Sequence, residues 1–151
     1  MRWHPAALIA FLTGLIASGH ISTNIYTPSM SSMVDYFATD AGRVQMTLMS
    51  FLFAFATGQL VCGALSDRYG RRVVLLFGLA IFAAATVLSI FAQTIETLIA
   101  ARVLQGFGAA SGSVIGRAII RDLFGREQTA KVMAYVAMAM GLAPAFAPII
   151  G

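Results

Sequence analysis

A few polar side chains inside long apolar runs are the residues of this sequence that could do chemistry. Arg102 is the clearest case, because it lies six residues beyond Glu96 within such a run. That separation is about 9 Å along a helix. An arginine at such a depth in a membrane helix costs about 2.5–3.5 kcal/mol, so it usually faces a cavity or a partner, although it can also extend toward the lipid headgroups. We expect Arg102 to face a cavity, with Gln105 on the same helical face.

His20 and Asn24 are the expected partners of Arg102. They are four residues apart, so they share one face of the first apolar run, and Tyr26 follows them. Counted along the run, their depth is comparable to that of Arg102. A histidine titrates near neutral pH and can relay protons, but a lone histidine is more often a hydrogen-bonded packing residue. The sequence leaves both roles open for His20.

A short basic stretch, residues 63–72, joins two uncharged runs of spanning length, which is typical of a membrane hairpin. Asp67 is its unusual residue, because a carboxylate at the C-terminal end of a helix meets the negative end of the helix dipole. We expect Arg68 and Arg71, on the same side of the membrane, to neutralise it in part, and Arg121 with Asp122 to extend this network.

The composition indicates an integral membrane protein. Of the 151 residues, 59% are hydrophobic and 11% are charged, whereas soluble domains carry about 25% charged residues. The net charge of +4 does not indicate nucleic-acid binding, because the basic residues lie in short stretches between apolar runs. Cys62 is the single cysteine. No disulfide framework, metal-ligand cluster, cofactor motif or enzyme constellation is apparent in the sequence, so we expect no enzyme and no cofactor.

Charge-free runs predict the membrane spans. The expected fold class is an all-α integral membrane bundle of about five transmembrane helices, residues 6–27, 44–66, 73–95, 97–116 and 132–151. A basic loop is expected over residues 117–131. Most Lys and Arg residues fall on the side of the N-terminus, so the positive-inside rule makes that side cytoplasmic.

Small residues at a spacing of four predict close helix packing. Gly108, Gly112 and Gly116 recur in the fourth span, and a weaker series lies in the second span: Ala54, Gly58 and Cys62. Lipid provides no hydrophobic drive for helix association, so small residues are what allow two backbones to approach closely. We expect both spans to be buried in the bundle.

Several stretches resemble one transporter family. Residues 63–72 resemble, without a gap, the signature between spans two and three of major facilitator superfamily transporters. Residues 102–106 resemble the fourth-span motif of that superfamily, and residues 144–151 resemble the Pro/Gly-rich fifth-span motif of its drug:proton antiporters. Residues 22–28 and 121–124 are similar to the Bcr/CflA-like multidrug efflux branch.

This resemblance implies a twelve-helix transporter of two six-helix halves, each built from inverted three-helix repeats. It also implies that drugs or other small apolar or cationic compounds are exported in exchange for protons by alternating access. The expected location is the bacterial inner (plasma) membrane. The expected partners are the substrate, protons, the lipid bilayer and a C-terminal transporter half.

The resemblance also assigns roles to residues. The acid matching Asp67, with the basic residue matching Arg71, contacts the other half and helps to lock the outward-facing state. We call the corresponding set the latch: Gly63, Asp67, Arg68, Gly70, Arg71, Arg72, Arg121 and Asp122. The arginine matching Arg102 takes part in proton coupling, for which His20 is a second candidate. The residues expected at the substrate cavity are Asn24, Tyr26, Gln105 and Pro144.

Two departures from the family pattern affect these expectations. Many relatives carry Asp where this chain has Asn24, so the usual first-span proton-binding carboxylate is missing. Ala143 replaces the glycine that commonly precedes the fifth-span proline. From its length we expect the chain to be the N-terminal portion of a transporter. The alternatives are a non-transporting membrane fragment or subunit, and a metabolite uptake transporter of the same superfamily.

Overall fold

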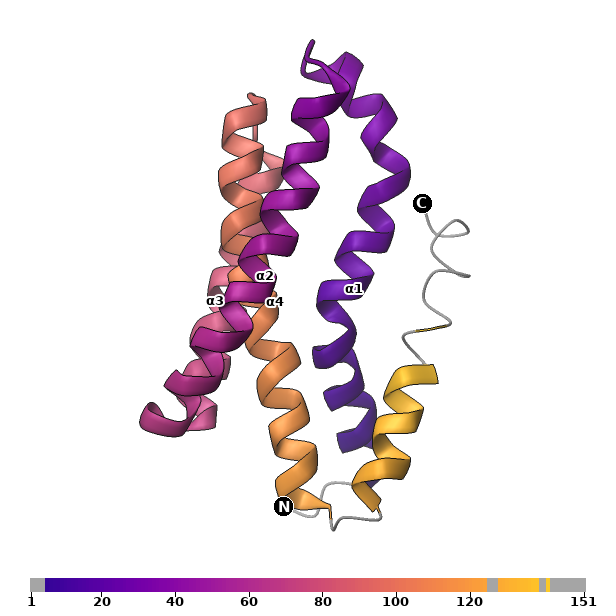
Figure 1. The fold of residues 1–151 in the computed structure, drawn as a ribbon, viewed down its shortest axis with the longest axis vertical. Helices are drawn as coiled ribbons and strands as arrows, with labels where there is room; N and C mark the ends of the chain where they lie inside the picture. The colour runs from indigo at the N-terminus through magenta and orange to yellow at the C-terminus, as the bar shows by residue number, and fades with distance from the viewer. Residues whose placement is uncertain (1–4, 125–127, 139–140, 142–151) are drawn as a thin grey trace.

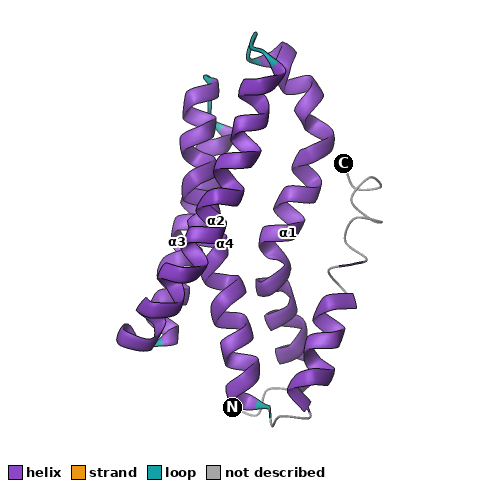
Figure 2. Ribbon diagram, viewed as in Figure 1, coloured by secondary structure: helices purple, strands orange, loops and turns teal. Residues whose placement is uncertain are grey.

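The computed structural model describes residues 5–124, 128–138 and 141, and side chains from residue 9 onward. Its elements are four long helices: α1 (Pro5–Tyr36), α2 (Ala41–Tyr69), α3 (Arg71–Ile90) and α4 (Ile95–Leu123). A further helix covers residues 128–138. Every element of the described part of the chain is a helix (Figures 1 and 2). The predicted fold class, a helical membrane bundle, is therefore confirmed.

Local chemistry explains where the helices begin and end. Asp40 is the N-cap of α2, and its carboxylate accepts a hydrogen bond from the Arg43 backbone N–H at 3.0 Å. Thr94 caps α4 in the same way through the Thr97 N–H, at 3.3 Å. Gly70 separates α2 from α3 with φ +87°, a backbone conformation that favours glycine. These caps keep the connections between the long helices short.

Two helices are longer than the sequence analysis expected. The first span was expected to end near Pro28, but α1 continues through this proline to Tyr36. Residues 117–131 were expected to form a loop, which is wrong for residues 117–123, because α4 continues to Leu123, and for residues 128–131, which begin the next helix. A helix satisfies its own backbone hydrogen bonds. It therefore does not have to end where the charge-free run ends. The limits of the membrane spans themselves remain predictions.

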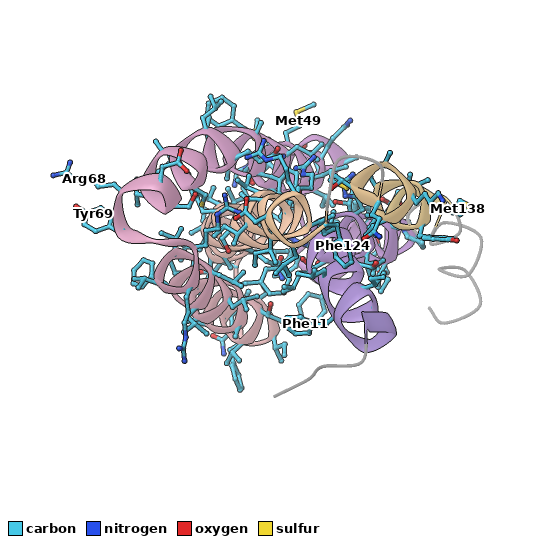
Figure 3. All side chains as sticks on the ribbon, turned by 90° about the horizontal axis from the view of Figure 1, so that it is seen from below. Phe11, Met49, Arg68, Tyr69, Phe124 and Met138 are labelled. Atoms are coloured by element: carbon cyan, nitrogen blue, oxygen red, sulfur yellow. The ribbon has the colours of Figure 1, made fainter. Side chains whose placement is uncertain are left out.

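The central helix of the bundle is α4. Seen from below, it lies among α1, α2 and α3 (Figure 3). Its glycines allow these contacts. A Cβ atom at Gly106 would lie 2.5 Å from the Phe51 carbonyl oxygen of α2, and one at Gly112 would lie 2.9 Å from the Leu15 carbonyl oxygen of α1. The predicted burial holds for most of α4. On α2 only one face is buried, and Cys62 is only partly covered.

Hydrophobic clusters pack the two ends of the bundle. One joins α1, α4 and the helix 128–138 through its buried members: Leu12, Leu15, Ile16, Ile120, Val132 and Val136. The other joins α2 and α4 at the opposite end: Val44, Ala92, Ile95 and Leu98. The polar residues considered below lie between these clusters or at the outer ends of the helices.

Large apolar side chains cover the outside of the bundle. Leu60 is 79% exposed, Phe53 72% and Phe77 69%. Within the described residues, α2, α3 and α4 are each long and apolar enough to cross a membrane. Exposed apolar surface on this scale is typical of a membrane or partner interface rather than of a surface in water.

Candidate functional site

The guanidinium of Arg102 is buried where α1, α2 and α4 meet. Arg102 is only 8% exposed. Its Cζ atom lies 3.4 Å from the ring centroid of Tyr26 on α1 and 5.9 Å from that of Phe51 on α2. Its Nη1 donates a hydrogen bond to Gln105 Oε1 at 2.9 Å. The cation is therefore held by the face of an aromatic ring and by an amide.

Further hydrogen bonds fix both of these partners. Gln105 donates through Nε2 to Thr86 Oγ1 on α3, at 2.9 Å. The Tyr26 hydroxyl is hydrogen-bonded to the Thr47 hydroxyl on α2, which lies 2.6 Å from the Val44 carbonyl oxygen. The result is a polar layer that ties all four long helices to Arg102. Within the described part of the chain, only the Nε of Arg102 in this layer is buried without a hydrogen-bond partner.

A small hollow between α1 and α2 brings His20 and Asn24 together. Its volume is about 120 Å³, and we call it the α1–α2 hollow. Its lining residues are Gly19, His20, Thr23, Asn24, Phe51, Leu52 and Phe55. The sequence analysis correctly grouped His20 with Asn24, but it paired them with Arg102. In the structure His20 is exposed and its ring is nearly perpendicular to that of Phe55, with 6.2 Å between the ring centroids, while the Arg102 guanidinium lies on Tyr26.

The ends of α2 and α4 enclose a larger hollow of about 550 Å³, which we call the basic-end hollow. Several of the residues assigned to the latch line it together with an additional arginine: Gly63, Asp67, Arg71, Arg121 and Arg117. Arg71 forms an ion pair with Asp122, which links the start of α3 to the end of α4. Asp67 is exposed and lines the same hollow as these arginines, and it forms no ion pair with another described residue.

The remaining latch residues point outward. The Arg68 guanidinium lies 5.5 Å from the ring centroid of Tyr69, and both side chains extend away from the bundle in Figure 3. Arg72 is also exposed. Arg68 is therefore not the neutralising neighbour of Asp67 that the sequence analysis considered.

Sequence reasoning missed the role of Arg117. Its Nη2 donates to Ser113 Oγ at 2.7 Å and to Gln59 Oε1 on α2 at 3.2 Å, while its Nε donates to the Ser113 carbonyl oxygen at 3.0 Å. It therefore bridges α2 and α4 beside the basic-end hollow. The four-residue spacing of Ser113 and Arg117 was the available signal. Thr47, Thr86 and the Phe51–Phe55 pair were also missed. Pro144, the last of the expected cavity residues, lies outside the described residues.

Comparison with known proteins places these features in a family. The family model described as "Major Facilitator Superfamily" matches residues 7–151. "Multidrug resistance protein D" of Escherichia coli is 35% identical over 99% of this chain and 38% of its own length. The "Bicyclomycin resistance protein homolog" of Haemophilus influenzae is 34% identical over 85% of this chain and 32% of its own length.

A third relative, the "Chloramphenicol resistance protein" of Pseudomonas aeruginosa, is 30% identical over 99% of this chain and 36% of its own length. The chain spans about a third of the length of these three relatives. All three carry names that refer to drug resistance, and the match to this group extends over nearly the whole sequence.

Proposed function

The chain belongs to the major facilitator superfamily, a family of membrane transporters, and we propose that it forms the N-terminal part of a proton-coupled drug exporter. The exporter would move drugs or other small apolar or cationic compounds across the inner membrane by alternating access. The names of the relatives support drugs as the substrate class. A second transporter part, corresponding to the remaining two thirds of these relatives, would complete the substrate pathway.

The burial of Arg102 is the observation that carries this proposal. Retaining a permanent cation inside a membrane helix is costly, and such residues usually mark an ion, proton or substrate pathway. Tyr26 and Gln105 hold the guanidinium on the inner side of the bundle instead of letting it extend to the headgroups. We assign Arg102 to proton coupling, with His20 in the neighbouring α1–α2 hollow as the group that could exchange a proton.

The basic end supports a second part of the proposal, a latch between transporter parts. The Arg71–Asp122 ion pair joins two helix ends, while Asp67 remains exposed beside it. An exposed carboxylate at the negative end of a helix dipole gains from a cationic or amide-donating partner. We propose that the second transporter part supplies this partner in the outward-facing state.

The distribution of charges supports a cytoplasmic N-terminus. At the end opposite the latch, Arg43 is paired with Glu96 at 2.6 Å, while Asp35 and Asp40 form no ion pair with another described residue. The latch end carries an excess of exposed cations: Arg68, Arg72, Arg117, Arg121 and Lys131. Cytoplasmic loops of bacterial membrane proteins carry such an excess of Lys and Arg.

Replacement of Arg102 tests the proposal. We expect Arg102→Ala, in the complete transporter that contains this chain, to reduce proton-driven export at least about ten-fold without loss of membrane insertion. Inverted membrane vesicles with an imposed proton gradient would be assayed for uptake of chloramphenicol and of ethidium. Arg43→Ala is the matched control, because its exposed ion pair with Glu96 contributes about 0–1 kcal/mol. Full export by Arg102→Ala would contradict the coupling role, and a wild type that exports neither compound would contradict drug export.

A further inference from the structure

The α1–α2 hollow has the size and the walls of a binding site for an aromatic ring. Its volume of about 120 Å³ is close to that of the roughly 150 Å³ apolar cavity that binds benzene in an engineered protein. Phe51 and Phe55 form one wall, with ring planes 10° apart and centroids separated by 6.1 Å. Phe55 lies directly over Gly19, where an added Cβ atom would approach its Cε2 to 2.8 Å. A bound ring would therefore meet aromatic faces and edges, which are favourable stacking partners.

Three of the seven residues that line this hollow are polar, His20, Thr23 and Asn24, and the others are apolar. The Thr23 hydroxyl is already bonded to the Gly19 carbonyl oxygen at 3.1 Å. The half-buried amide of Asn24 makes no side-chain hydrogen bond to another described residue, so both its donor and its acceptor are available to a ligand. An amide can bind a neutral hydroxyl, nitro or carbonyl group without adding a charge.

The electrostatic environment of the hollow is cationic. Arg102 lies 5.9 Å from the Phe51 ring centroid, so a ligand stacked against this wall would be roughly 10 Å from its charge. The acidic residues that the structure describes all lie near helix ends, at an N-cap or in a first or last turn, and do not offset it: Asp35, Asp40, Asp67, Glu96 and Asp122.

From these contacts we infer that the α1–α2 hollow binds an aromatic ring of neutral substrates and disfavours organic cations. The inference rests on the proposed drug export and narrows its substrate class. At an effective dielectric constant of 20, a positive charge roughly 10 Å away weakens binding of a cation by about ten-fold, whereas a neutral ring experiences no such penalty. The Asn24 amide, rather than a carboxylate, would then orient the neutral substrate.

Equilibrium binding tests this inference independently of transport. The complete transporter would be purified, and binding of chloramphenicol, a neutral nitroaromatic compound, would be compared with that of ethidium, a permanent aromatic cation. We expect Asn24→Asp to tighten ethidium binding by at least about ten-fold, because it adds a negative charge to the hollow. It should weaken chloramphenicol binding by about three- to ten-fold, because a carboxylate cannot replace the hydrogen-bond donor of the amide. Arg102→Gln removes the positive charge and should also tighten ethidium binding. Arg102→Lys retains the charge and should preserve the wild-type preference for chloramphenicol over ethidium.

The aromatic wall has its own matched pair of variants. Phe55→Leu should weaken chloramphenicol binding by about five-fold because it removes a stacking partner, whereas Phe53→Leu on the exposed face of α2 should not change it. If ethidium binding is unaffected by Asn24→Asp and by a folded Arg102→Gln, the charge argument is overturned. Equal effects of Phe55→Leu and Phe53→Leu would exclude the hollow as the site. If the transporter exports both drugs but gives either of these contradicting binding results, the proposed function stands and only this inference is overturned.

Discussion

At the scale of single residues, the energetics of Arg102 depend on an aromatic ring rather than on a carboxylate. A desolvated cation–π contact contributes about 2 kcal/mol, and a hydrogen bond to a charged group contributes about 1.5–3 kcal/mol. Together they contribute about 3.5–5 kcal/mol, which offsets the cost of about 2.5–3.5 kcal/mol for an arginine within a membrane helix. Tyr26 and Gln105 are therefore sufficient to keep the cation in place without neutralising it.

Two substitutions of Tyr26 separate its ring from its hydroxyl group. Tyr26→Phe keeps the aromatic face under Arg102 and removes only the hydrogen bond with Thr47, so we expect a loss of about 1 kcal/mol. Tyr26→Leu removes the face and should cost about 2 kcal/mol more. Thermal unfolding of the complete transporter would measure this, with a clearly lower melting temperature for Leu than for Phe. Equal melting temperatures would show that the hydroxyl, not the ring, supports Arg102.

The sequence could not identify the particular partner of Arg102. The spacing of His20 and Asn24 correctly placed them on one helical face, and Arg102 does find its partner on the first helix. That partner is Tyr26 because the rotation of α1 about its own axis is fixed by its contacts with α2 and α4. This rotation is set by contacts between helices, and the spacing of residues within one helix does not determine it.

At the scale of helices, the glycines of α4 lie against different neighbouring helices. A spacing of four predicted one packing face, but Gly108 packs against α3, whereas Gly112 and Gly116 pack against α1. Each step of four residues also rotates the position by about 40° around the helix, so Gly108 and Gly116 face directions about 80° apart. The sequence therefore predicted that α4 packs closely, but not which helix each glycine contacts.

Alanine substitutions of two glycines test this packing. A Cβ atom at Gly108 would lie 2.6 Å from the Phe82 backbone nitrogen and 2.7 Å from the Gly78 carbonyl oxygen, so the backbones of α3 and α4 must separate. We expect Gly108→Ala to destabilise the protein by about 1–3 kcal/mol. Gly14→Ala is the control, because its added Cβ would have no described atom within 4 Å apart from its own stretch of helix, and alanine favours a helix by up to about 1 kcal/mol. Differential scanning fluorimetry would compare them, and equal melting temperatures would contradict close packing at Gly108.

At the scale of the whole molecule, the chain is a bundle whose ends differ in charge. The charge-free runs were enough to predict a helical membrane protein, because membrane helices need long apolar segments. They did not predict that α4 would be central or that residues 117–123 would extend it. Those features depend on contacts between helices. The distribution of charges along the chain indicates only which environment each helix occupies, not which helices it contacts.

The charge difference between the ends predicts the orientation of the bundle, which site-directed labelling can measure. In a Cys62→Ala background, Asp35→Cys would mark the α1–α2 connection and Arg72→Cys the start of α3, both at exposed positions. Because Arg43 is paired with Glu96, the first end has no unpaired cation among its described residues, whereas the second end is rich in exposed arginines. By the positive-inside rule, a membrane-impermeant maleimide added to intact spheroplasts should label Asp35→Cys at once and Arg72→Cys only after membrane disruption. Labelling in the reverse order would invert the orientation and place the latch on the outer face, where it could not close the cytoplasmic side of a transport pathway.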